Sequence, residues 1–154
     1  MPIPKRSKYN TGQGKGQKVT IDGYVFDSRM EASYYVNVLL PKVRKGIVKS
    51  FTVHPKYTLQ DKFVKNGQTY RAITYEADFE EVYADHTVIV DVKGMETQQG
   101  LMGRKMFHYR YRDKELLWIA YSARFGGWVE YDQLKKMKKE AKKKESVSNA
   151  SSNL

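Results

Sequence analysis

The chain of 154 residues contains no cysteine. This absence excludes disulfide bonds, thiolate zinc sites and cysteine nucleophiles. The chain also lacks any run of about 18 consecutive apolar residues that could span a membrane, and its first residues lack the apolar stretch of a secretory signal. These absences predict a soluble protein that has no membrane partner and resides in the cytoplasm.

Size and composition predict one folded domain. A chain of this length has the commonest size for a single hydrophobic core, and 40% of its residues are hydrophobic. The first residues are polar and rich in glycine, and the last are rich in lysine and serine. We therefore expect a flexible basic arm at 1–18, a folded domain at 19–132, and a Lys-rich helix with a disordered tail at 133–154.

Acidic residues are absent from the first 18 positions, and the net charge of +11 is concentrated at the two ends of the chain. Residues 1–18 and 133–154 each carry +5, which leaves +1 for the middle. Two basic ends predict a nucleic acid partner, because lysine and arginine release counterions when they contact phosphates. The alternative is that they only aid solubility. The residues expected to contact DNA from the ends are Lys5, Arg6, Lys8, Lys135, Lys136, Lys138 and Lys139.

Two dipeptides predict tight β-hairpins. Asp22-Gly23 lies within 19–26, and Asn66-Gly67 separates β segments at 56–64 and 69–79. Both dipeptides tolerate the positive φ angles of a type I′ turn.

A helix is predicted over 29–45. Ser28 and Glu31 have the spacing of a capping box, and apolar residues follow at helical intervals. Pro41 is expected to kink or shorten this helix, and Gly46 to end it.

The remaining apolar patterns complete the expected fold. Further strands are predicted at 47–53, 86–92 and 116–122, and further helices at 101–112 and 131–145. The segment at 86–92 is apolar enough to be buried on both faces. The order of elements predicts an α/β or α+β domain with a central mixed sheet.

The sharpest chemical feature is Asp91-Val92-Lys93 at the end of the strand predicted at 86–92. Alternation along a strand puts Asp91 and Lys93 on one face. Asp78 ends the preceding β segment, and a hairpin or an adjacent strand could bring it beside Asp91. Two carboxylates near one lysine favour a site for Mg²⁺, which prefers oxygen ligands. The alternative is a salt-bridged strand end without catalytic function.

This order of residues resembles the PD-(D/E)xK nuclease superfamily. It is most similar to a small phage-associated endonuclease family of unassigned role, and its layout is similar to phage junction-resolving endonucleases and to the endonuclease subunit of certain transposition systems. The resemblance covers about 26–110 and departs from the superfamily pattern at Ala77, where proline is common. The segments that carry it are Phe26-Asp27-Ser28-Arg29-Met30-Glu31-Ala32-Ser33-Tyr34-Tyr35, Gly46-Ile47-Val48-Lys49-Ser50-Phe51, Tyr75-Glu76-Ala77-Asp78-Phe79 and Val90-Asp91-Val92-Lys93-Gly94.

The resemblance implies a restriction-endonuclease-like core with a central sheet flanked by helices. It further implies that the protein is a metal-dependent DNA endonuclease acting on duplex, branched or junction DNA, in the bacterial host cytoplasm if the chain is phage-derived. Asp78, Asp91 and the main-chain carbonyl of Val92 would bind Mg²⁺, for which Mn²⁺ would substitute. Glu31 would orient a water or a second ion, and Lys93 would hold or help deprotonate the attacking water.

Further implications concern DNA contact and assembly. Lys105, with the neighbouring Arg104, would contact a phosphate from the helix at 101–112, and a symmetric homodimer would be needed for paired cuts. Lys105 can equally be an exposed helix lysine.

Several alternatives stay open. Position N3 of a capping box also requires Glu31, and both of its roles can coexist. His54, His86 and His108 lack the spacing of metal ligands and are interpreted as surface or packing residues. The second functional hypothesis is a nucleic-acid-binding protein without catalysis that uses its basic termini, and metal binding would discriminate between the two.

Overall fold

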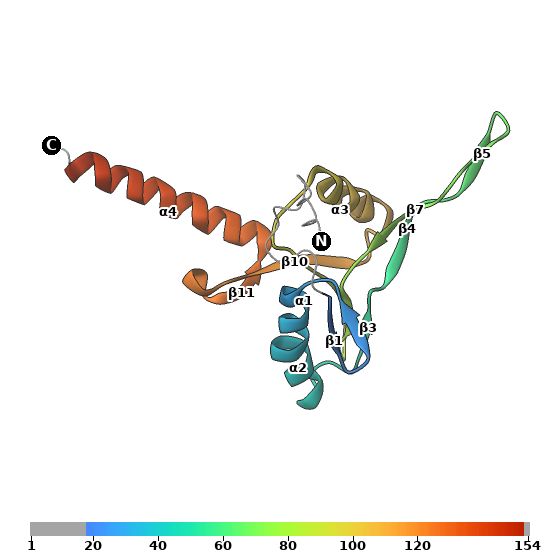
Figure 1. Ribbon diagram of the computed structural model, residues 1–154, viewed down its shortest axis with the longest axis horizontal. Coiled ribbons are helices and arrows are strands. Elements are labelled where there is room, and N and C mark those ends of the chain that lie inside the picture. Colours follow the sequence, from blue (N-terminus) through green and yellow to red (C-terminus); the bar gives the residue numbers. More distant parts are fainter. Residues whose placement is uncertain (1–17, 153–154) are drawn as a thin grey trace, which may run out of the picture.

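The apolar segments of residues 18–152, which the computed structural model describes, form a central mixed sheet of five strands. Strands β9 and β10 pair in parallel, and the other neighbours pair antiparallel. The fold is therefore α+β with a mixed central sheet and helices beside it, as the sequence predicts (Figure 1). In spatial order the strands are β11 (Gly127–Glu130), β10 (Glu115–Ser122), β9 (Thr87–Val92), β8 (Phe79–Val82) and β3 (Ser50–Val53).

Strand β9 separates two hydrophobic cores because its side chains alternate between the faces of the sheet. Val88, Val90 and Val92 pack with the helical segment at 29–44, whereas Ile89 packs with Phe107 of the helix on the other side. The prediction of a strand buried on both faces is confirmed. Asp91 follows the alternation of Ile89 and lies on the same side as Phe107.

The helix predicted over 29–45 is present, with a wide turn in its middle. Leu40 N–H donates to the carbonyl of Tyr35, five residues earlier. The next residue, Pro41, has no N–H to donate, and the π-helical turn lets the chain pass it without a break. Gly46 ends the helix with a φ of 71°. The segment consists of α1 (Arg29–Tyr34), a π-helical turn (Tyr35–Leu39) and α2 (Leu40–Arg44).

Both predicted type I′ hairpins are present. Asp22 and Gly23 have φ angles of 54° and 80°, and Asn66 and Gly67 have 51° and 73°. These positive values are the ones that such turns require. The paired strands are β1 (Val19–Ile21) with β2 (Tyr24–Phe26), and β5 (Phe63–Lys65) with β6 (Gln68–Tyr70).

The prediction of one strand at 69–79 is wrong, because three separate strands cover this region. The middle one, β7 (Ile73–Glu76), pairs with β4 (Lys56–Gln60), and β8 then joins the central sheet. Beyond β4 and β7 the chain continues into the hairpin β5–β6, which projects from the body (Figure 1). We refer to residues 61–72 as the ribbon arm.

The C-terminal helix α4 (Tyr131–Ser152) is longer than predicted. The tail after residue 145 was expected to be disordered, yet it is helical through Ser152, where hydroxyl groups of Ser151 and Ser152 donate to carbonyls one turn earlier. Among its residues only Leu134 is buried, and the helix extends away from the body (Figure 1). Of the arm predicted at 1–18, residues 1–17 lie outside the described residues.

Helix α3 (Gln98–Arg110) begins three residues earlier than predicted. Thr97 caps it, since its hydroxyl oxygen accepts from Gly100 N–H at 3.0 Å. A short 3₁₀ turn (Ala123–Phe125) links β10 to β11, and the sequence patterns did not identify β11. Within 18–152, none of the helices combines the length and the apolar character needed to cross a lipid bilayer.

Candidate active site

The end of β9 carries an ion pair at the centre of the candidate site. Lys93 Nζ lies 2.8 Å from Asp91 Oδ2, which agrees with the predicted placement of both side chains on one face. The Asp91 side chain is only 5% exposed. Lys93 also lies over the ring of Trp118, with 4.8 Å from Nζ to the ring centroid. The aromatic ring attracts the cation and restricts its position.

Asp78 lies opposite Asp91 because of the register between β8 and β9. Phe79 pairs with Val90, so the preceding and following residues face each other. Asp78 N–H donates to the carbonyl of Val90 at 3.1 Å, and Val92 N–H donates to Asp78 Oδ2 at 2.6 Å. The hairpin that the sequence left as one of two alternatives therefore brings the two carboxylates together.

The electrostatics of this pair are unfavourable for two negative charges. Burial, together with the negative charges of Asp91 and Glu31, raises the pKa of Asp78 to about 9. The Val92 amide acts in the opposite direction, because it donates a hydrogen bond to the carboxylate. Three acidic groups thus share one buried region, and Lys93 is the cation in contact with Asp91.

Tyr75 and Trp118 form a chain of donors that orients Asp91. The Tyr75 hydroxyl donates to Asp91 Oδ2, and Trp118 Nε1 donates to the Tyr75 oxygen at 2.8 Å. Burial and the neighbouring Asp91 raise the pKa of Tyr75, so this hydroxyl keeps its proton. The parallel register of β9 and β10 pairs Trp118 with Asp91 and so explains how Trp118 reaches this site.

Glu31 performs the predicted capping role and faces the site. Its amide donates to Ser28 Oγ at 3.1 Å, and its own Oε2 accepts from Asp27 N–H at 3.2 Å. The second bond reaches one residue before the expected Ser28 amide. Burial raises the pKa of Glu31, partly offset by the Asp27 amide and by His54.

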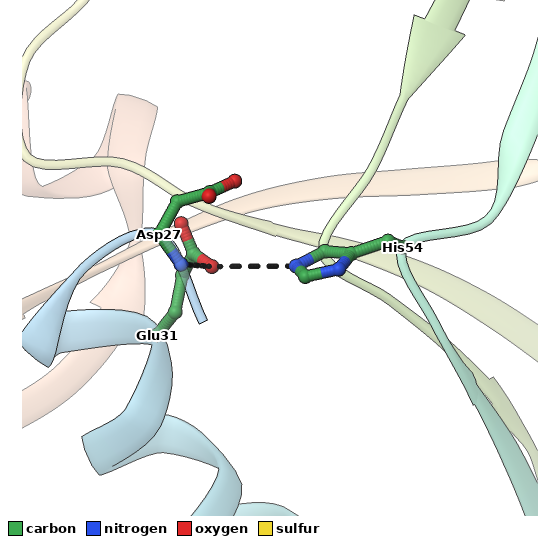
Figure 2. Close-up of side chains that lie close together, drawn as sticks. All are labelled: Asp27, Glu31 and His54. Atoms are coloured by element: carbon green, nitrogen blue, oxygen red, sulfur yellow. Dashed lines mark hydrogen bonds and ion pairs between the residues drawn. The ribbon is translucent and has the colours of Figure 1, made fainter. Parts of the chain in front are cut away.

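His54 is the residue that the sequence analysis missed. Its Nε2 lies 3.6 Å from Glu31 Oε2, and a dashed line marks this contact in Figure 2. Within the described part of the chain, the same nitrogen is buried without a hydrogen-bond partner. Asp27, Glu31 and His54 each offer one ligand atom within 4.8 Å of the others. No local spacing signals this group, since His54 follows β3 and meets α1 only through the fold.

The backbone holds His54 in an unusual conformation. Its φ is 53°, in the left-handed region that histidine adopts more readily than most residues. In this conformation His54 N–H donates to the carbonyl of Asp78 at 2.9 Å. His54, beside Glu31, and Asp78, opposite Asp91, are therefore linked by one backbone hydrogen bond.

An open cleft of about 550 Å³ gives access to the ion pair. Its walls are β7, the end of β9 and the first half of α3. Asp91, Lys93 and Gln99 line it, whereas Asp78 and Glu31 do not. The cleft reaches Ile73, the residue from which the ribbon arm departs.

The predicted DNA contacts differ in their surroundings. Arg104 forms an ion pair with Asp132 at 3.1 Å and stacks on Trp118, and Lys135 pairs with Glu96 at 2.9 Å. Lys105 is exposed. Among residues 18–152, no ion pair involves Lys105 or the other predicted lysines of α4, which are Lys136, Lys138 and Lys139. Lys5, Arg6 and Lys8 lie outside the described residues.

A protein-family comparison matches residues 6–127 to the model described as "Protein of unknown function (DUF1064)". The chain belongs to the DUF1064 family. The DUF1064 match includes every residue of the candidate site and ends at Gly127, so α4 lies beyond it. A search of the curated proteins finds no match, and neither does a search of the solved structures.

Proposed function

We propose that the protein is a metal-dependent DNA endonuclease of the PD-(D/E)xK type, which hydrolyses phosphodiester bonds in duplex, branched or junction DNA. The observation that carries this proposal is the facing pair Asp78 and Asp91, with Lys93 in contact with Asp91 at the edge of an open cleft. Buried carboxylates are costly unless a cation or a function compensates for them.

The donor set fits a hard divalent cation. Burial and the neighbouring acids hold the pKa of Asp78 near 9, and a bound cation would favour the ionised form of Asp78. Asp78, Asp91 and the main-chain carbonyl of Val92 would hold Mg²⁺, and Mn²⁺ would substitute, because both prefer oxygen ligands. Such an ion, when bound, supplies Lewis-acid activation of the phosphate and lowers the pKa of water.

The side chains around the pair have distinct roles in this proposal. Lys93 donates hydrogen bonds to the attacking water and to a phosphate oxygen, where it offsets the charge that develops in the transition state. Tyr75 holds Asp91 in place through its hydroxyl. The water oxygen bonds to phosphorus and gives up a proton to solvent, while the bond to one bridging ester oxygen breaks and that oxygen takes a proton from solvent. The products are a phosphate end and a hydroxyl end.

Glu31 acts beside this pair rather than within it. Its negative charge contributes to the raised pKa of Asp78, and His54 lies next to its carboxylate. Glu31 would orient a water or hold a second ion, with Asp27 and His54 as further potential ligands. The same carboxylate continues to accept the Asp27 amide that begins α1.

DNA contact and assembly complete the proposal. Lys105 on α3 and the exposed lysines of α4 would contact phosphates directly. Arg104 and Lys135, which are paired with Asp132 and Glu96, would exchange that acid for a phosphate, since ion pairs near the surface contribute little to stability. Paired cuts would require a homodimer. We place the activity in the cytoplasm, where DNA and Mg²⁺ are both present.

A second candidate is a nucleic-acid-binding protein without catalysis. The exposed, Lys-rich surface of α4 favours it, because this helix projects from the body with a single buried residue. In that case Asp78 and Asp91 would be structural acids. Thermal melting discriminates the two, since Mg²⁺ or Ca²⁺ stabilises a protein with a metal site by mass action.

The deciding experiment assays labelled junction, forked, duplex and single-stranded DNA side by side with Mg²⁺, with Mn²⁺ and with chelator. We expect cleavage of at least one DNA form with either metal and none in chelator. An absence of cleavage under all conditions, by a folded protein that still binds DNA, would leave the second candidate. Cleavage in chelator would contradict the metal-dependent proposal.

A further inference from the structure

We infer that the ribbon arm is a DNA-binding element that enters a groove of the duplex held at the cleft. This inference rests on the proposed function, and it assigns a substrate contact to a segment outside the acidic site. The first observation in its support is exposure: β5 and β6 are exposed at every residue, and Val64 in the middle of β5 is 65% exposed. Nothing else in the described chain covers either face of the hairpin.

The charge of the ribbon arm complements a polyanion. It contains Lys62, Lys65 and Arg71 against a single acid, Asp61. Asp61 is already paired with Arg110 of α3 at 3.2 Å, whereas no ion pair within residues 18–152 involves any of the three cations. Cations without acidic neighbours are the groups that a phosphate backbone would neutralise.

The dimensions of the arm match a groove of B-form DNA. Six steps along the chain lead from Gln60, the end of β4, to Asn66 in the turn, and at about 3.3 Å per step they reach roughly 20 Å. The cross-strand pair Phe63 and Tyr70 stacks with centroids 4.7 Å apart, which holds the two strands together. A two-stranded ribbon fits the major groove of B-form DNA, but side chains cannot enter the narrow major groove of A-form RNA.

The arm and the cleft are continuous. Ile73 lines the cleft and begins β7, and the ribbon arm ends at the residue before it. Tyr75 on the same strand holds Asp91. A duplex that presents a phosphate to Asp91 and Lys93 therefore lies beside the base of the arm, and the arm determines how that duplex is oriented.

The test measures affinity in chelator, so that it is independent of cleavage. A short fluorescein-labelled DNA duplex is titrated with the parent protein, with the triple variant Lys62→Ser, Lys65→Ser, Arg71→Ser, and with a control of equal charge. The control changes three exposed cations outside both basic ends and away from the cleft, namely Arg44→Ser, Lys45→Ser and Lys49→Ser. A shortened variant replaces residues 61–72 with Asn-Gly between the paired residues Gln60 and Ile73.

We expect the arm triple to raise Kd about tenfold or more and to lower the salt slope of log affinity by up to about three units, one for each lost phosphate contact. The control triple should change the slope by less than about one unit. The shortened variant should behave like the arm triple while melting as one transition. Equal effects of the two triples, or no DNA binding by the parent protein, would overturn the inference.

Two further readouts exclude other partners. Because the chain has no cysteine, Val64→Cys provides a single attachment point for a photo-crosslinker, with Ile47→Cys, 49% exposed on the body, as its matched control. We expect Val64→Cys to crosslink to duplex DNA and Ile47→Cys not to. Tighter binding of an RNA duplex, or a shortened variant that changes from dimer to monomer with unaltered DNA affinity, would overturn the inference.

The outcomes separate this inference from the nuclease proposal. Binding that depends on the arm without any cleavage would support the arm and contradict the nuclease. Cleavage with metal, together with an arm triple that binds as the parent does, would contradict the arm alone.

Discussion

The acids of the candidate site and the cations of the ribbon arm and α4 occupy opposite environments. Asp78 and Asp91 are buried beside the aromatic rings of Tyr75 and Trp118, whereas the cations of the ribbon arm and of α4 are exposed to water. Charges interact strongly in the interior and are screened by salt at the surface. We therefore expect the buried acids to control chemistry and the exposed cations to control affinity, and the two effects should be separable by mutation.

The strongest test of this comparison removes a buried charge without changing shape. Asp91→Asn and Asp78→Asn should each lower cleavage by at least about a thousandfold, because a metal site that contributes several kcal/mol loses a carboxylate ligand. DNA affinity should stay equal or increase, since a negative charge near the phosphate is lost. Cleavage rates and anisotropy titrations check both expectations.

The matched control is Glu81→Gln, which changes another buried acid. Glu81 lies on the opposite face of the sheet, where Tyr34 donates to its carboxylate at 2.8 Å. We expect this variant to cleave DNA at close to the parent rate. Normal cleavage by Asp78→Asn or Asp91→Asn would show that the facing acids are structural.

A smaller loss is expected at Glu31, where capping and chemistry overlap. Glu31→Gln retains an oxygen that accepts the Asp27 amide but removes the negative charge, so cleavage should fall about a hundredfold with little change in the free energy of unfolding. Timed cleavage assays measure the rate of cleavage, and urea unfolding measures the free energy of unfolding.

Ser28→Ala is the counterpart that changes stability alone. It removes the hydroxyl that accepts from Glu31 N–H and should cost about 1 kcal/mol of unfolding free energy. Cleavage should stay substantial where the fold survives. If Glu31→Gln cleaves normally, Glu31 is only a cap.

On the basic side of the comparison, truncation of both ends should weaken DNA binding about tenfold or more and reduce its salt dependence. Removing residues 1–17 and 136–154 deletes most of the charge of the ends but keeps Leu134, the residue of α4 that is buried. The rate of cleavage at saturating DNA should stay near that of the parent. An unchanged salt slope would show that the ends do not contact phosphates.

The smallest expected effect is a pH dependence of the stability of the metal-free protein, which arises from the buried Asp78. The pKa of Asp78 is about 9 in the folded protein, against the ordinary value of 3.8 that applies in the unfolded chain. Between these two pH values the folded state therefore binds more protons than the unfolded state. Metal-free stability should therefore be greatest at low pH within this window and fall as the pH rises through it. In chelator, we expect Tm to fall by a few degrees more in the parent than in Asp78→Asn.

The control for this pH series is Asp113→Asn, an exposed change that should leave the pH dependence of Tm as in the parent. Added Mg²⁺ should stabilise the parent most at high pH, where Asp78 is ionised. A pH dependence that is equal in the parent and in Asp78→Asn would contradict the assignment to Asp78.

Local chemistry explains which features could be predicted from the sequence. The turns at Asp22-Gly23 and Asn66-Gly67 depend on backbone preferences of adjacent residues, and the shared face of Asp91 and Lys93 depends on alternation within one strand. The fold class follows from such local patterns, and so does the start of α1 at Ser28.

Contacts between residues that are distant in the sequence could not be predicted from those local patterns. The division of 69–79 into three strands depends on different partners, since β6 pairs with β5, β7 with β4, and β8 with the central sheet. His54 reaches Glu31 only because β3 and α1 pack on the same core. The projection of the ribbon arm likewise reflects what the rest of the fold leaves uncovered, which no local spacing encodes.

The position of β9 has a consequence for how the molecule opens. This strand is hydrogen-bonded along both edges and is buried on both faces, so its amides can exchange with solvent only when the whole domain unfolds. The hairpin β5–β6 has no such cover and can open by itself. The carboxylate of Asp91 is thus carried by a slowly exchanging strand, whereas the segment proposed to meet the DNA groove exchanges more readily.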